Sequence, residues 1–175
     1  MRWLLSLLLV IVMAGDVRAA GEGAFWPQDR LPVRSYMPEA WQPYVADAVV
    51  AFNRRMPRSV PRLVYHAKPQ RRCEGIPARR SVHAIVICPN DRGHLTLYDQ
   101  DRGRIVTSAV VRIWREEMAI YRANTICHEL MHALTGIPDR SWQESYGAES
   151  CVWGDVLAVP GPADIAFAQQ VYRRH

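Results

Sequence analysis

Hydrophobic residues recur every three or four positions in three parts of the chain, and this spacing predicts three helices. In the first part, Trp41, Val45 and Phe52 fall on one face of a helix. The second part is followed by Gly136 and Pro138, two residues that end helices. The three helices are expected at residues 38–56, 116–135 and 162–172.

Short runs rich in β-branched and aromatic residues, each bounded by Pro, Gly, Asn or Asp, are typical of strands. Such runs occur at residues 31–37, 62–66, 82–88, 94–98 and 104–114. The resulting order of one strand, a helix, four strands, a helix, a loop and a final helix predicts an α/β (α+β) fold. We expect a single domain whose mixed, twisted sheet packs on a long N-terminal helix and on the second helix, with a C-terminal helix beside them.

The first residues have the pattern of a secretory signal peptide. Arg2 precedes an apolar run from Trp3 to Met13, and Val17-Arg18-Ala19 provides a cleavage site. The run is shorter than the roughly 20 residues that a membrane-spanning helix needs. We therefore expect a signal peptide over residues 1–19 and a mature domain over 20–175. The mature protein would be secreted or periplasmic, with no stable membrane anchor.

The chain is basic, with 22 Lys and Arg against 17 Asp and Glu and a net charge of +5. Its Arg-Arg pairs are dispersed along the sequence and do not alternate with aromatic residues, as they would in a surface that binds nucleic acid. We interpret the charge as a solvated basic surface and expect no nucleic-acid partner. The sequence gives no indication of the oligomeric state.

Four cysteines lie in the expected mature domain, and an even number in an exported chain indicates disulfides. Four cysteines allow three pairings. We favour Cys73 with Cys88, which would close a short loop, and Cys127 with Cys151, which would tie the second helix to the segment after it. A zinc site made of cysteines is not indicated, because no two cysteines have the C-x2-C spacing.

The second expected helix carries the motif His128-Glu129-Leu130-Met131-His132. Residues four apart lie one turn apart on the same face of a helix, so both imidazoles can reach one metal ion. Zinc lowers the pKa of a bound water, and Glu129 is placed to act as the general base that takes its proton. Cys127, Leu130 and Leu134 lie on another face, which we expect to be buried.

A catalytic zinc usually has three protein ligands and one open position. Asp139 is the nearest candidate for the third ligand, because Gly136 can turn the chain back towards the metal. Glu149 and Glu144 are alternatives. Three other histidines, at positions 66, 83 and 94, fall on or beside expected strands and are interpreted as surface residues.

The segment HELMHALTGIPD resembles the zinc motif of the metzincin peptidases, in which a glycine turn leads to a third ligand, His or sometimes Asp. The tail Pro162-Ala163-Asp164-Ile165-Ala166, with Gln169, Val171 and Tyr172, resembles the C-terminal helix of matrixin-like members. The resemblance implies a zinc metallopeptidase-like domain over residues 20–175. It further implies a protein or peptide substrate lying extended beside an edge strand, for which residues 94–98 are the candidate.

The chain differs from the metzincin pattern in two places. The glycine and the third ligand are the fourth and seventh residues after the second histidine, instead of the third and sixth. No methionine follows Met131, so the methionine turn of the family is replaced by Ser150-Cys151-Val152. A bridge between Cys127 and Cys151 is a hypothesis for what supports the metal site instead.

Two other functions remain open from the sequence. The chain could be a metal-binding module of the cell envelope without proteolytic activity, or a zinc amidase that acts on a non-protein substrate. A serine hydrolase is not indicated, because the chain has no G-x-S-x-G motif.

Overall fold

The computed structural model describes residues 23–68, 83–101, 105–137, 139, 149–152 and 157–173. The expected signal peptide, residues 1–19, lies outside these residues, as do Cys73 and Glu144. No helix in the described ranges is long and apolar enough to cross a membrane.

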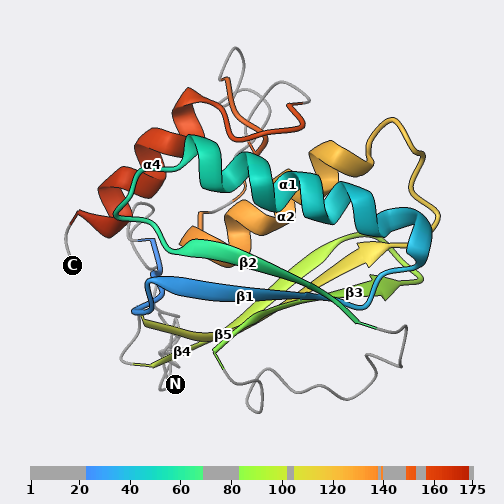
Figure 1. Cartoon of the computed structure of the whole chain (residues 1–175), viewed down its shortest axis with the longest axis horizontal. Coiled ribbons are helices and arrows are strands. Elements are labelled where there is room, and N and C mark those ends of the chain that lie inside the picture. The colour runs from blue at the N-terminus through green and yellow to red at the C-terminus, as the bar shows by residue number, and fades with distance from the viewer. Residues whose placement is uncertain are drawn as a thin grey trace, which may run out of the picture.

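Within the described residues, five strands form one mixed sheet (Figure 1). The sheet has the order β2-β1-β3-β5-β4, in which the first four strands are parallel and β4 pairs antiparallel with β5 at one edge. The mixed sheet expected from the sequence is therefore confirmed. The strands are β1 (Arg30–Ser35), β2 (Arg62–Ala67), β3 (Ile85–Asn90), β4 (Leu95–Asp101) and β5 (Ile105–Trp114).

The first helical segment differs from the continuous helix expected over residues 38–56. It begins as a 3-10 turn, η1 (Glu39–Trp41), and continues as α1 (Gln42–Arg55). Pro43 explains the change, because it has no N–H with which to bond the carbonyl of Glu39 four residues earlier. The N–H of Gln42 bonds that carbonyl instead, which gives the tighter 3-10 spacing.

The second helix, α2 (Arg122–Thr135), begins six residues later than expected. Glu117 is not helical, and its carboxylate lies 2.8 Å from His94 beside β4. The same carboxylate accepts a hydrogen bond from the backbone N–H of Met118. Glu117 thus belongs to the turn before α2 and not to the helix. The last helix, α4 (Pro162–Tyr172), has the bounds that the sequence predicts.

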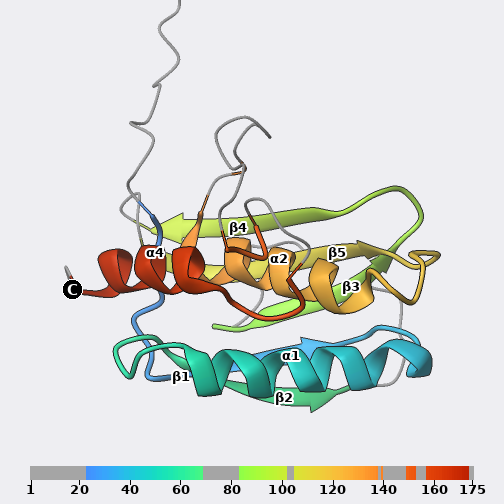
Figure 2. The ribbon, with the colours of Figure 1, turned by 90° about the horizontal axis from the view of Figure 1, so that it is seen from above.

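The helices α1 and α2 lie on the same face of the sheet (Figures 1 and 2). The main core fills the space between these helices and the sheet. There, Leu31 and Val33 of β1 and Ile85 and Ile87 of β3 are fully buried. A much smaller buried cluster of Val86, Cys88 and Val110 lies on the other face. The helices that carry the candidate site thus rest on the main core.

Candidate metal centre

Helix α2 has one buried face and one face that carries the two motif histidines. Ile126, Leu130 and Leu134 are fully buried, as their helical spacing predicts. His128 and His132, one turn apart, remain partly accessible, with side chains 30% and 12% exposed. The buried face fixes the helix on the sheet, so the histidine face has a defined position.

Gly136 ends α2 in a left-handed conformation, with φ of 61° and ψ of 22°. A Cβ on this residue would lie 2.9 Å from the backbone nitrogen of Ala24, so both the conformation and the space require glycine. The left-handed turn redirects the chain after α2. Asp139 is thereby brought back beside the second histidine of the helix.

The last carbonyls of α2 would be unsatisfied in an isolated helix. Here they accept hydrogen bonds from both ends of the described chain. The indole N–H of Trp26 donates to Ala133 at 2.8 Å, and the hydroxyl of Tyr172 donates to Leu134 at 2.8 Å. The N–H of Ala24 donates to Thr135 at 2.8 Å. These bonds hold the end of the helix at which the metal ligands lie.

Three ligand atoms converge beside α2. The Nε2 atoms of His128 and His132 are 2.9 Å apart, and Oδ1 of Asp139 lies 3.3 Å from the first and 3.1 Å from the second. Among the described residues, these three form the candidate metal-binding group. Asp139 is the most accessible of them, with its side chain 75% exposed.

Each histidine is oriented by a backbone carbonyl. Nδ1 of His132 lies 2.6 Å from the oxygen of Ile137, and Nδ1 of His128 lies 3.3 Å from the oxygen of Cys151. A carbonyl can only accept, so in each neutral ring the proton is on Nδ1 and Nε2 carries a lone pair. Metal-ligating histidines are usually held in this way.

This arrangement fits a metal ion such as zinc. When both rings are neutral, two lone pairs and a carboxylate oxygen face one another within 3.3 Å, and a cation bound between them would relieve their repulsion. Ligands at zinc distances of 2.0–2.1 Å in a tetrahedron are about 3.3 Å apart, close to the observed separations. His128, His132 and Asp139 could therefore serve as three ligands of such an ion.

The surroundings of His128 favour its neutral form. Burial lowers its pKa below the ordinary value of 6.5, and the neighbouring His132 lowers the pKa further. Glu129, Asp139 and the carbonyl of Cys151 act in the opposite direction but do not reverse the shift. A neutral imidazole is the form that binds a metal.

Glu129 is buried, with only 5% of the residue exposed. Its Oε2 accepts a hydrogen bond of 2.5 Å from the hydroxyl of Thr96, which belongs to the edge strand β4. The two residues face a cleft of about 290 Å³ between β4 and the end of α2. The cleft is lined by His94, Leu95, Thr96, Glu129, His132, Gly136, Ile137 and Asp139. A buried carboxylate thus opens on the same cleft as two of the metal-binding residues.

The segment beside the site is fixed by a disulfide and a buried aspartate. Cys127 and Cys151 are bonded, which confirms the predicted pairing. Asp164 of α4 is fully buried and accepts hydrogen bonds from the hydroxyl of Ser150 and the N–H groups of Cys151 and Gly161. Because the carbonyl of Cys151 faces His128, both links contribute to the orientation of this ligand.

The other candidates from the sequence are Glu149, Glu144 and the second cysteine pair. Glu149 is described, and it does not belong to the metal-binding group that contains Asp139. The other alternative, Glu144, lies outside the described residues. Cys88 is disulfide-bonded, while its predicted partner Cys73 also lies outside the described residues.

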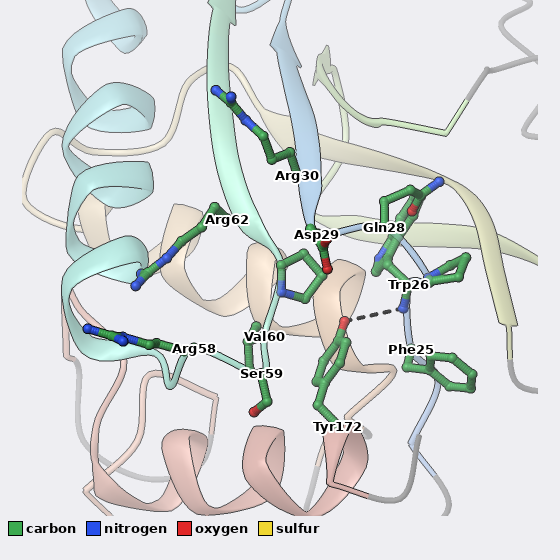
Figure 3. A pocket seen from close by; sticks show the side chains of 12 residues that line it. Phe25, Trp26, Gln28, Asp29, Arg30, Arg58, Ser59, Val60, Arg62 and Tyr172 are labelled. Carbon is green, nitrogen blue, oxygen red and sulfur yellow. Dashed lines mark hydrogen bonds between the residues drawn. The ribbon is translucent and has the colours of Figure 1, made fainter.

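A larger pocket, of about 520 Å³, lies between the segment from Phe25 to Arg30, the turn after α1 and Tyr172 (Figure 3). Figure 3 shows that the side chains of Arg30, Arg58 and Arg62 point away from Tyr172. Burial raises the pKa of the Tyr172 hydroxyl, which stays protonated as a donor to the end of α2. The pocket contains none of the metal-binding residues, so we assign the chemistry to the smaller cleft.

No protein-family model and no curated protein matches the chain. A function is therefore argued from the site itself. Sequence reasoning identified the two histidines, Glu129 and Asp139, but it missed Thr96. A threonine in a strand carries no signal for a bond to a residue 33 positions away.

Proposed function

We propose that the chain is a zinc-dependent metallopeptidase of the metzincin type. The observation that carries this proposal is the convergence of His128, His132 and Asp139 beside the buried carboxylate of Glu129. A structural histidine pair would not need two Nε2 lone pairs facing a carboxylate. A metal site without catalysis would not need a buried base on the same cleft.

The protein's residues divide into ligands and a base. His128, His132 and Asp139 would hold the zinc, which when bound would supply the Lewis acidity that polarises a carbonyl and acidifies water. Glu129 accepts the proton of the attacking water at Oε1, because Oε2 is bonded to Thr96. The same carboxyl can then release this proton to the amine of the leaving group.

The substrate we propose is an extended segment of protein or peptide. Strand β4 is at the edge of the sheet, and its first two residues, Leu95 and Thr96, line the cleft together with His94, the residue before the strand. An edge strand offers unpaired backbone groups with which an extended peptide can form hydrogen bonds. Such pairing would hold a peptide bond beside Glu129.

The metzincin assignment is supported by the left-handed turn at Gly136 and by the placement of Asp139 next to both histidines. The extra residue in this turn does not keep Asp139 from the site. We propose that Cys151, bonded to Cys127, stands in place of the methionine turn of the family. We also propose export of the protein, because its cysteines at this site are oxidised.

The test combines zinc content with peptide cleavage. Purified wild type should bind one zinc per chain and cleave casein or a fluorogenic peptide library. Glu129→Gln keeps the shape of the side chain and removes the base. It should retain zinc and lose activity by roughly 10²- to 10⁴-fold, the usual contribution of general acid–base catalysis.

The matched control is Glu149→Gln, an identical change at a glutamate outside the metal-binding group, which should leave the activity unchanged. Equal activity of wild type and Glu129→Gln would overturn the mechanism. Zinc binding without any peptide cleavage would instead favour the non-proteolytic module or the amidase that the sequence leaves open.

A further inference from the structure

Thr96 lies where the edge strand passes over the active-site helix. Its hydroxyl oxygen is 2.5 Å from Oε2 of Glu129 and 3.3 Å from the backbone carbonyl of the same residue. The neighbouring side chains of Leu95 and Leu97 are 47% and 44% exposed. Alternation along a strand places them on the opposite face. Thr96 is thus the position in this part of β4 that faces the helix.

The hydroxyl has one proton and two acceptors within reach. A hydroxyl bonds a carboxylate more strongly than it bonds a neutral carbonyl, and the carboxylate is also the nearer acceptor. The proton therefore points to Oε2 of Glu129. This bond leaves Oε1 of the same carboxylate to accept a proton from the cleft.

A buried glutamate has several staggered side-chain conformations, and only some of them direct the carboxylate to the cleft. We propose that Thr96 is a positioning residue, which fixes the carboxylate of Glu129 in the orientation required for proton transfer. Because Thr96 belongs to β4, it also ties this base to the strand beside which the substrate would lie. The inference rests on the proposed peptidase function.

The test uses Thr96→Val, which keeps the branched shape of the side chain and removes the hydroxyl. We expect kcat to fall by roughly 10- to 100-fold, the usual effect of losing such a supporting contact. The KM and the zinc content should change little. Thr96→Ser restores a hydroxyl without the methyl group and should recover most of kcat.

The matched control is Thr107→Val on the adjacent strand β5. The hydroxyl of Thr107 donates its hydrogen bond to the carbonyl of Asp99 at 3.4 Å, and not to Glu129. This variant should keep the wild-type kcat. It separates the loss of the Thr96 bond from a general weakening of the sheet.

Three results would overturn the inference: an unchanged kcat in Thr96→Val, a Thr96→Ser variant as impaired as Thr96→Val, or a rise in KM alone. If zinc-loaded wild type cleaves no peptide, the proposed function fails by itself. The role of Thr96 is then decided by crystal structures of the zinc-loaded Thr96→Val variant. A displaced Glu129 carboxylate would support the inference, and an unmoved one would refute it.

Discussion

The carbonyl oxygen of Cys151 lies 3.3 Å from Nδ1 of His128, and the sulfur of Cys151 is bonded to Cys127, the residue before that histidine. One residue therefore contacts the metal-binding helix twice. The hydrogen bond sets the tautomer of the His128 ring. The disulfide keeps the carbonyl that makes this bond close to the helix.

Replacing both Cys127 and Cys151 by alanine should reduce stability and zinc affinity together. The bridge joins residues 24 positions apart, and the loss of such a loop costs about 3–4 kcal/mol. Zinc should bind roughly 10- to 100-fold more weakly, because the supporting carbonyl of a ligand is no longer fixed. Urea unfolding and competition with a zinc chelator measure the two effects.

A reducing agent provides the control for this experiment. It should weaken zinc binding by the wild type, in which it breaks the disulfide. The double alanine variant lacks this disulfide, so its zinc binding should not be weakened in the same way. Unchanged zinc affinity in the folded double variant would show that the disulfide does not support the metal site.

Asp139→Ala should weaken zinc binding more than the loss of any supporting contact, which costs roughly 10- to 100-fold. The carboxylate is one of three ligands, and its removal leaves two. Isothermal titration with zinc measures the affinity. Glu149→Ala is the control, and a larger loss of affinity in that variant would identify Glu149 as the ligand.

The stability of the metal-free protein should decrease as the pH falls below about 6.5. The pKa of His128 is lowered in the folded state, first by burial and then by His132. Between the folded pKa and 6.5 the unfolded chain binds more protons at this position, so stability rises with pH across this window. This stability is present above pH 6.5 and is lost as the pH falls through the folded pKa.

Urea unfolding of metal-free protein between pH 5 and 8 tests this dependence. His128→Asn removes the titrating ring, so the fall in stability on the acid side should be smaller in that variant. An equally steep fall in both proteins would assign the pH dependence to other groups.

Gly136→Ala should destabilise the protein by at least about 2 kcal/mol, since an alanine is strained in the left-handed conformation and its Cβ would meet the backbone of Ala24. Gly93→Ala is a matched control. Gly93 also has a positive φ, of 58°, but nothing lies within 4 Å of the added Cβ. It should cost only about 1 kcal/mol, from the conformation alone. Thermal or urea unfolding compares the two variants. Equal losses of stability would show that Ala24 moves aside at little cost in free energy.

The parts of the site that the sequence predicts are those set by short-range spacing. His128, Glu129 and His132 lie on one helix, and Gly136 has the left-handed conformation that ends it. The sequence also predicts the pairing of Cys127 with Cys151, because this bridge would tie the helix to the segment that follows it. The Cys73–Cys88 pairing stays a prediction.

The parts that were not predicted depend on contacts between distant segments. Helix α2 begins later than predicted because Glu117 bonds His94, which lies beside β4. No local pattern in the sequence indicates that partner. The contact of Thr96 with Glu129 and that of the Cys151 carbonyl with His128 depend on how the sheet and the helices pack against one another. Helical spacing identifies ligands, but the residues that orient them come from the tertiary fold.

The hydrogen bonds at the end of α2 bear on the order in which the molecule is made. Trp26 bonds both Ala133 and Tyr172, residues that lie 107 and 146 positions further along the chain. A ribosome releases Tyr172 long after Trp26, so the end of α2 lacks this hydrogen-bond donor until residue 172 has been synthesised. Contacts over such separations form slowly. Under the proposed function, we therefore expect zinc to be loaded into a chain that has already docked α4.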